Sequence, residues 1–256
     1  MIFDSHAHYD DEAFTEDRDS LLNSLQEQGI TAVMNVGASL GSTKTSIALA
    51  EAYDFIYAAA GVHPSETEEL DEQSFLWLKE QCAHEKVLAV GEIGLDYYWP
   101  EPDRDLQKKW FERQLALAEE VGLPVIIHSR DAAKDTLDIM QKMHAEKIGG
   151  VIHCFSYEKE MAKIYVDMGF YIGIGGVLTF KNARKTRKVV ESIPLERIVL
   201  ETDSPYLAPV PNRGKRNDSR NLPYVVTEIA KIKNISEEEV MEVTMANAKR
   251  LYRISD

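Results

Sequence analysis

The chain has 256 residues, of which 44% are hydrophobic and 28% are charged. This length and composition are typical of a globular protein that buries its own apolar core, and we expect one domain over residues 1–256. The two cysteines form no CxxC pair, which excludes a disulfide framework. The formal net charge of −14 argues against tight binding to extended duplex DNA. Residues 179–220 nevertheless hold ten Lys and Arg against five Asp and Glu, so a phosphate-bearing substrate stays open.

The N-terminal segment, MIFDSHAHYDDEAF, lacks the basic stretch and apolar core of a signal peptide. No apolar run approaches the roughly 18 residues that a membrane span needs. We therefore expect a cytoplasmic protein with no membrane association. Nothing in the sequence identifies a stable protein partner.

Short apolar runs alternate with helical patterns along the whole chain, which favours parallel strands covered on both faces. The expected strands are Ile2–His6, Ala32–Val36, Ile56–Ala60, Val87–Glu92, Val125–His128, Gly150–His153, Phe170–Ile174 and Ile198–Asp203. The expected helices are Thr15–Gln28, Asp103–Val121, Asp131–Ala145, Lys159–Met168, Asn182–Ser192, Pro223–Lys233 and Ser236–Tyr252.

Eight such units could form a doubly wound sheet or a closed barrel. No G-x-G-x-x-G follows the first strand, so the usual dinucleotide site of a doubly wound sheet is missing. Histidines and carboxylates also end strands that are spread along the whole chain, and a closed barrel brings such strand ends to one mouth. We therefore predict a (β/α)8 TIM barrel with an additional C-terminal helix.

Six strand-end side chains predict a metal site. His6 and His8 form an H-A-H pair, and residues two apart on a strand point to the same side. The others are Glu92, His128, His153 and Asp203. Six donors exceed what one tetrahedral catalytic ion needs, and they suit two divalent ions bridged by a carboxylate, for which Glu92 is the natural candidate.

Longer motifs in the same order resemble the TatD-type metal-dependent deoxyribonucleases, within the amidohydrolase-like barrels. The motifs are DSHAH at 4–8, GVHP at 61–64, VGEIGLDYY at 90–98, HSRDA at 128–132, HCFS at 153–156, ETDSPYLAP at 201–209 and RGKRN at 213–217. The resemblance covers the whole chain and implies a two-metal site and hydrolysis of DNA, often from the 3′ end of single strands. Family members often read RGKRNEP, whereas this chain has RGKRNDSRNLP, so the loop after the eighth strand differs slightly.

With two metals, we expect His6, His8, Glu92 and Asp203 around one ion and Glu92, His128 and His153 around the other. Asp203 and Glu92 are the expected catalytic carboxylates, and Asp203 is placed to accept a proton from water. We assign phosphate binding to four residues near the mouth: His63, Arg130, Arg213 and Lys215. Arg216 lies beside the last two in the same basic loop.

Each of these assignments has a plainer alternative. His63 precedes Pro64 and could cap a turn, and Arg130 could pair with Asp131. Glu201 could orient water or be a buried partner of another group. Most of the basic residues between 181 and 188 fit the solvated face of a helix. The ligands do not distinguish zinc, manganese, magnesium, iron or nickel.

Three other functions stay open at this stage. The same fold could hydrolyse small esters or amides, although related enzymes often bridge their metals with a carboxylated lysine where Glu92 stands. It could also deacylate mischarged transfer RNA, with D-aminoacyl-tRNA as the substrate. A catalytically silent binding protein would leave a complete set of buried charges unused, which is costly.

Overall fold

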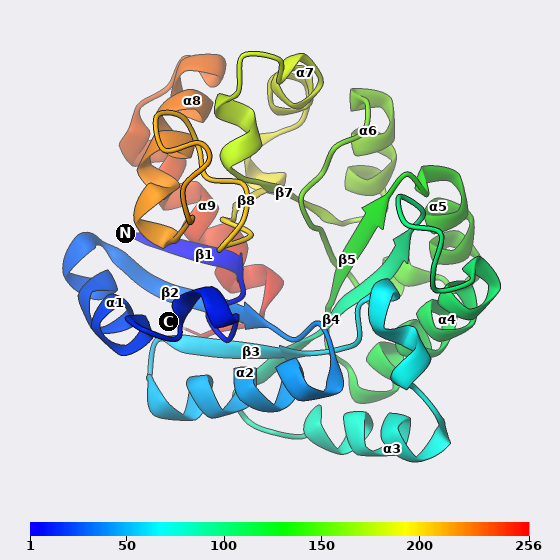
Figure 1. Cartoon of the computed structure of the whole chain (residues 1–256). Coiled ribbons are helices and arrows are strands. Elements are labelled where there is room, and N and C mark those ends of the chain that lie inside the picture. The colour runs from blue at the N-terminus through cyan, green and yellow to red at the C-terminus, as the bar shows by residue number, and fades with distance from the viewer. Residues whose placement is uncertain (256) are drawn as a thin grey trace.

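A computed structural model describes residues 1–255 and contains one eight-stranded parallel sheet whose strands are neighbours in chain order (Figure 1). The strands are β1 (Ile2–Ala7), β2 (Ile30–Val36), β3 (Ile56–Ala60), β4 (Val87–Asp96), β5 (Val125–Arg130), β6 (Gly150–Ile152), β7 (Tyr171–Ile174) and β8 (Ile198–Leu200). The helices are α1 (Arg18–Leu25), α2 (Leu40–Ala52), α3 (Glu72–Gln81), α4 (Arg104–Val121), α5 (Ala133–Lys142), α6 (Lys159–Asp167), α7 (Arg184–Ser192), α8 (Leu222–Lys233) and α9 (Glu237–Leu251).

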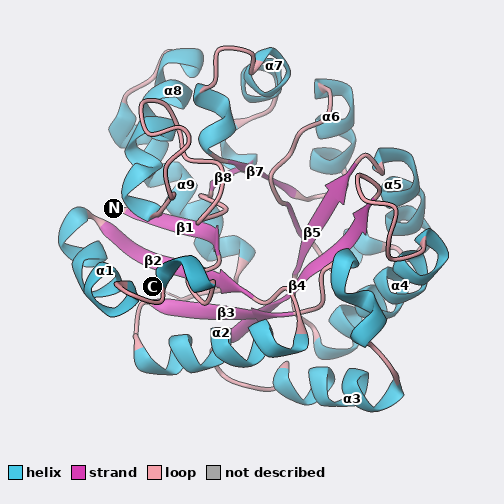
Figure 2. Ribbon diagram, viewed as in Figure 1, coloured by secondary structure: helices cyan, strands magenta, loops and turns pink. Residues whose placement is uncertain are grey.

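The sheet closes on itself between β1 and the segment after β8. Ala7 forms a parallel bridge with Ser204, and the backbone N–H of His8 donates to the Ser204 carbonyl at 2.9 Å. The N–H of Asp203 donates to the His6 carbonyl at 3.0 Å. Helices surround the closed sheet (Figure 2). The predicted barrel with its C-terminal helix, α9, is confirmed, and the doubly wound alternative is excluded.

Successive side chains along each strand point alternately into two separate apolar cores, as in other barrels. The larger core lies between strands and helices and includes Val33, Ile56 and Ile127. The inner core takes one or two residues from most strands, among them Phe3, and is joined by the end of α9. The hydroxyl of Tyr252 donates to the Ser5 carbonyl at 2.8 Å, which ties that end of the chain to β1.

Strand ends near the mouth differ from the sequence prediction: β1 and β5 end one and two residues later than expected, and β4, β6 and β8 differ as follows. β4 continues four residues beyond Glu92 to Asp96, whereas β6 ends one residue before His153 and β8 ends three residues before Asp203. Asp203 has φ 56°, a left-handed conformation that ends any strand. Functional side chains are therefore carried both by strands and by the turns that follow them.

Two helices, α2 and α3, were not predicted. α2 contains Gly41 and several Ser and Thr residues, so its helical signal is weak, and it begins where Ser39 accepts a hydrogen bond from the N–H of Ser42. The first helix is shorter than the predicted Thr15–Gln28, because α1 ends at Leu25 and a 3-10 turn follows. No helix within residues 1–255 is long and apolar enough to cross a membrane.

Candidate metal centre

All six side chains proposed as ligands meet at the carboxyl-terminal mouth of the barrel. His6 lies in β1, Glu92 in β4 and His128 in β5, while His8, His153 and Asp203 lie in the turns after β1, β6 and β8. His6, Glu92 and His153 are at most 4% exposed. Buried histidines and carboxylates at this density need partners or cations, because an unpaired buried charge is costly.

Glu92 is at the middle of this cluster, and its two oxygens face different histidines. Oε2 lies 3.3 Å from Nε2 of His6 and 3.8 Å from Nε2 of His8. Oε1 lies 2.7 Å from Nδ1 of His128 and 3.7 Å from Nε2 of His153. One carboxylate therefore has an oxygen for each of two neighbouring groups of ligands.

Glycine at position 94 allows β4 to approach β5 closely enough for this arrangement. Gly94 has φ 146°, and a Cβ at this position would lie 1.9 Å from the backbone oxygen of His128. A side chain larger than hydrogen would force the two strands apart. The close approach holds Glu92 and His128, on neighbouring strands, within contact.

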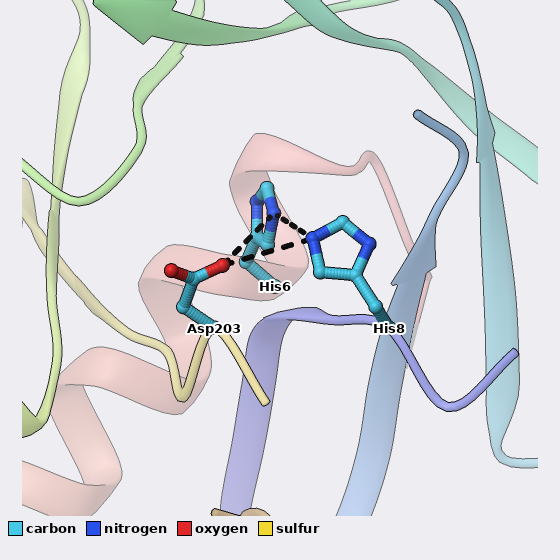
Figure 3. A group of neighbouring side chains, drawn as sticks. All are labelled: His6, His8 and Asp203. Atoms are coloured by element: carbon cyan, nitrogen blue, oxygen red, sulfur yellow. Dashed lines mark hydrogen bonds and ion pairs between the residues drawn. The ribbon is translucent and has the colours of Figure 1, made fainter. Parts of the chain in front are cut away.

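The first group of candidate ligands consists of His6, His8 and Asp203 (Figure 3). The Nε2 atoms of the two histidines are 3.1 Å apart, and Oδ1 of Asp203 lies 3.7 Å from that of His8 and 4.0 Å from that of His6. Nδ1 of His8 lies 2.9 Å from the Val36 carbonyl, which can only accept, so Nδ1 donates and Nε2 offers its lone pair to the site. Lone pairs and a carboxylate converge here as metal ligands do.

The electrostatics of the cluster favour positive charge. Burial lowers the pKa of His153, yet the carboxylates of Glu201, Glu92 and Asp203 raise it to about 10. Burial likewise opposes charge on His8, but Asp203 and Glu92 raise its pKa to about 9. Despite burial, the neighbouring imidazoles hold the pKa of Glu92 well below its usual range. Divalent cations meet this demand, so the donor set fits bound metal.

The second group of candidate ligands surrounds Oε1 of Glu92 and includes His128 and His153. His63 is close enough to Glu92 and His128 for the three to hold one ion, and its ring lies edge-on to that of His128 at 4.3 Å. Nδ1 of His63 accepts a hydrogen bond from the N–H of Ser65 at 3.1 Å, which leaves the proton on Nε2. Burial and the neighbouring His128 lower the pKa of His63 to about 3, so its ring is a neutral N–H donor. His63 does cap the turn that follows it, as one alternative expected, and it faces the site as well.

Two further carboxylates orient the histidines from behind. Oε2 of Glu201 lies 3.2 Å from Nδ1 of His153 and Oε1 accepts the N–H of Cys154 at 2.6 Å. Oδ2 of Asp96 lies 3.1 Å from Nε2 of His128. Such partners fix the tautomer and direction of a metal-binding imidazole. The sequence left the role of Glu201 open and did not single out Asp96.

A small cavity of about 40 Å³ adjoins Asp203, between the turns after β6, β7 and β8. Its lining includes Cys154, Gly173, Glu201 and Asp203. This volume is enough for a water molecule, and the Asp203 carboxylate borders it. Gly173 is needed here, because a Cβ would lie 2.2 Å from Oε2 of Glu201.

Comparison with known proteins agrees with this geometry. The family model for TatD-related DNases matches residues 3–253. The chain belongs to the TatD-related DNase family. It is 43% identical to the uncharacterized metal-dependent hydrolase YabD of Bacillus subtilis, with full coverage of both chains, and 36% identical to YcfH of Escherichia coli over 99% of this chain and 96% of that protein. This TatD-family member is a metal-dependent hydrolase.

Solved structures of TatD-family proteins share its fold. The Escherichia coli TatD homologue YjjV superposes with a TM-score of 0.93 and is 30% identical, with 99% of this chain and 98% of that chain covered. A phosphotriesterase homology protein of Escherichia coli, at 15% identity, has a TM-score of 0.71 over 98% of both chains, which shows likeness of fold alone.

The cationic residues expected to bind phosphate are placed unequally in this TatD-family protein. The Arg130 guanidinium lies over the Tyr98 ring at 3.8 Å, and that of Arg213 lies over the Phe180 ring at 4.5 Å. Lys215 is exposed. Arg216 instead forms two hydrogen bonds with Asp17, at 2.7 and 2.6 Å, and is occupied by this structural contact.

The basic loop, residues 213–217, is nevertheless anchored by hydrogen bonds beside the metal centre. The side-chain amide of Asn217 donates to the Thr202 carbonyl at 2.9 Å, next to Asp203, and its backbone N–H donates to the Pro205 carbonyl at 2.9 Å. The loop that carries Arg213 and Lys215 thus returns to the segment that carries Asp203. Asn217 is the last residue of the RGKRN motif at 213–217, so the motif itself carries this anchor.

Proposed function

We propose that this TatD-family hydrolase is a deoxyribonuclease that removes nucleotides from the 3′ end of single-stranded DNA. The position of Glu92 gives the proposal its main support: a buried carboxylate with one oxygen toward His6 and His8 and the other toward His128 and His153 suits a pair of ions. Paired ions are typical of enzymes that cleave phosphodiesters. The description of the matched family as TatD-related DNase supports the same substrate class.

The proposed ligand sets follow the two groups. His6, His8, Glu92 and Asp203 hold one divalent ion, and Glu92, His128 and His153 hold the other. Imidazole and carboxylate donors suit zinc, manganese, iron or nickel, and magnesium accepts the carboxylates. When bound, two such ions lower the pKa of water toward neutrality and offset the charge on phosphate oxygens.

The chain's own groups then position the substrate and move the proton. Asp203 borders the small cavity and accepts the proton of the attacking water. The water oxygen forms a bond to phosphorus as the bond from phosphorus to the 3′ oxygen of the remaining strand breaks, and that oxygen takes a proton from solvent. His63, as a neutral N–H donor, and Arg130 donate hydrogen bonds to the non-bridging oxygens of the scissile phosphate. Arg213 and Lys215 contact neighbouring phosphates of the strand. We place this reaction in the cytoplasm, as the sequence predicts.

One substrate panel tests this proposal. Protein loaded separately with zinc, manganese or magnesium is incubated with 3′- and 5′-labelled single strands, the matching duplexes, small esters and amides, and D-aminoacyl-tRNA. We expect stepwise shortening of single strands from the 3′ end, with loss of activity on chelation and in the Glu92→Gln variant. Turnover of an amide, ester or aminoacyl-tRNA with intact DNA strands would contradict the proposal and leave the metal-dependent hydrolase assignment in place.

A further inference from the structure

Two large aromatic side chains are exposed beside the metal centre. Trp99 is 58% exposed and Tyr98 is 53% exposed, in the segment that leaves β4 after Asp96. Burial of such rings is favourable, so adjacent exposed rings at the mouth of an active site mark a binding surface. Figure 2 shows this loop leaving the arrowhead end of β4, beside that of β5.

Hydrogen bonds fix this loop to the metal centre. The backbone N–H of Tyr98 donates to Oδ1 of Asp96 at 2.9 Å, and the other oxygen of the same carboxylate lies 3.1 Å from Nε2 of His128. The N–H of Tyr97 donates to the Arg130 carbonyl on β5 at 2.9 Å. One carboxylate therefore links the aromatic pair to a proposed metal ligand.

The rings are also ordered relative to each other. The Tyr98 and Trp99 rings meet edge to face, at 90° and with their centroids 4.8 Å apart. The Arg130 guanidinium lies over the Tyr98 ring at 3.8 Å. Pro100 follows Trp99 directly, and a fixed φ reduces the freedom of the loop. Tyr98 thus holds Arg130 on one side and Trp99 on another.

We propose that the Trp99 indole is a stacking platform for an unpaired nucleobase next to the scissile phosphate. Stacking on Tyr98 uses the face of the Arg130 guanidinium and leaves its in-plane N–H groups free to bind a phosphate oxygen. A phosphate donor and a bare aromatic face then lie side by side, which matches the phosphate and base of one nucleotide. This inference rests on the proposed nuclease function and deepens it.

The platform explains why single strands would be preferred. A base inside a duplex is covered on both faces, and the base at a duplex end is held by its pairing partner, whereas the end base of a single strand can turn onto an aromatic ring. Stacking is also tolerant of sequence, because every base has a π face. The indole therefore selects unpaired strand ends and discriminates little among the four bases.

Binding of short oligonucleotides tests the platform. All variants are made in the Asp203→Asn background, loaded with metal, so that strands bind without being cut. Trp99→Ala is expected to weaken the affinity for a labelled thymidine tetramer by roughly 5- to 150-fold in fluorescence anisotropy. Trp99→Phe, which keeps an aromatic face, should restore most of it. Leu76→Ala in α3, which removes a side chain of similar exposure (57%) from the outer helices, is the matched control and should bind like the background protein.

A set of tetramers, each with one abasic position, identifies the stacked base. The background protein should lose affinity at one abasic position, and Trp99→Ala should be insensitive to the same change because base and ring act as a pair. Equal abasic losses in both proteins would overturn the platform, as would unchanged affinity of Trp99→Ala. A change of oligomeric state on Trp99→Ala, seen by ultracentrifugation without a change in affinity, would assign the rings to a self-association surface instead. If wild-type protein cuts single strands but the binding results differ from those expected, only the platform is wrong. If wild-type protein neither binds nor cuts single strands, the nuclease proposal is wrong as well.

Discussion

Oε2 of Glu201 lies 3.2 Å from Nδ1 of His153, on the side of the imidazole ring away from Glu92. Both side chains are buried, and Oε1 of Glu201 is held by the N–H of Cys154. Since a carboxylate only accepts, Nδ1 keeps a proton, and Nε2 is the nitrogen that gives up its proton when a cation binds. We therefore expect Glu201 to orient His153 as a metal ligand.

Glu201→Gln should therefore weaken metal binding while the fold persists. An amide can present its N–H₂ group to Nδ1 and favour the wrong tautomer, and loss of such a partner typically lowers affinity by about 10- to 100-fold. Competition with a zinc indicator measures the change. Glu238→Gln, on the exposed side of α9, is the control and should bind zinc like wild type. Wild-type affinity in a folded Glu201→Gln protein would rule out the orienting role.

Asp203→Asn tests the proton acceptor. Asp203 has φ 56°, and Asn tolerates this left-handed conformation, so the backbone should be kept. We expect turnover to fall by about 10²- to 10⁴-fold, the range for loss of a general base, and by more if metal is lost as well. Metal content and circular dichroism accompany the rate measurement, and Asp138→Asn in α5 is the exposed control. Turnover near wild type would place the proton transfer on another group.

Arg213 and Lys215 are expected to set the salt dependence of DNA binding. Replacing both by Ala should flatten the log–log slope by about 1.4, since each single-strand phosphate contact contributes roughly 0.7. Arg216→Ala is a useful contrast, because its guanidinium already pairs with Asp17. It should leave the slope unchanged and loosen the loop. Equal slopes in wild type and the double variant would show that this loop does not contact phosphate.

Gly94→Ala tests the close approach of β4 and β5. A Cβ at Gly94 would meet the His128 carbonyl, and φ is in the left-handed region. We expect a loss of about 2–5 kcal/mol in the free energy of unfolding, from backbone strain and overpacking together. Gly214 also has positive φ, but a Cβ there would have nothing within 4 Å, so Gly214→Ala should cost about 1–2 kcal/mol. Similar losses for both variants in urea unfolding would refute steric crowding at Gly94.

The sequence predicted the barrel and the meeting of the six candidate ligands at its mouth because both depend on local patterns. Apolar runs that end in His or Glu place side chains at the carboxyl ends of strands, and closure of the barrel brings those ends together. Asp96 was missed because β4 was expected to end at Glu92. The strand continues, and residues 92, 94 and 96 then point to one side, which is the pattern that could have revealed it.

Contacts between distant turns were beyond such patterns. Glu201 and Asp203 lie past the end of β8, so neither side chain's direction follows from strand alternation. The pairing of Arg216 with Asp17 joins residues 199 positions apart, and only the folded chain reveals that this arginine is occupied. The same holds for the Arg130–Tyr98 stack, since the sequence offered Asp131 as the nearer partner.

Metal stoichiometry tests the central claim, that one carboxylate serves two ions. Wild-type protein and Glu92→Gln are each equilibrated with zinc or manganese, freed of excess ion, and measured by inductively coupled plasma mass spectrometry, with Glu238→Gln as control. We predict up to two ions per chain in wild type and a loss at both positions in Glu92→Gln, because the amide keeps the shape of the side chain but not its charge. A wild-type protein that stays metal-free at saturation, or a Glu92→Gln protein that keeps two ions, would contradict the account.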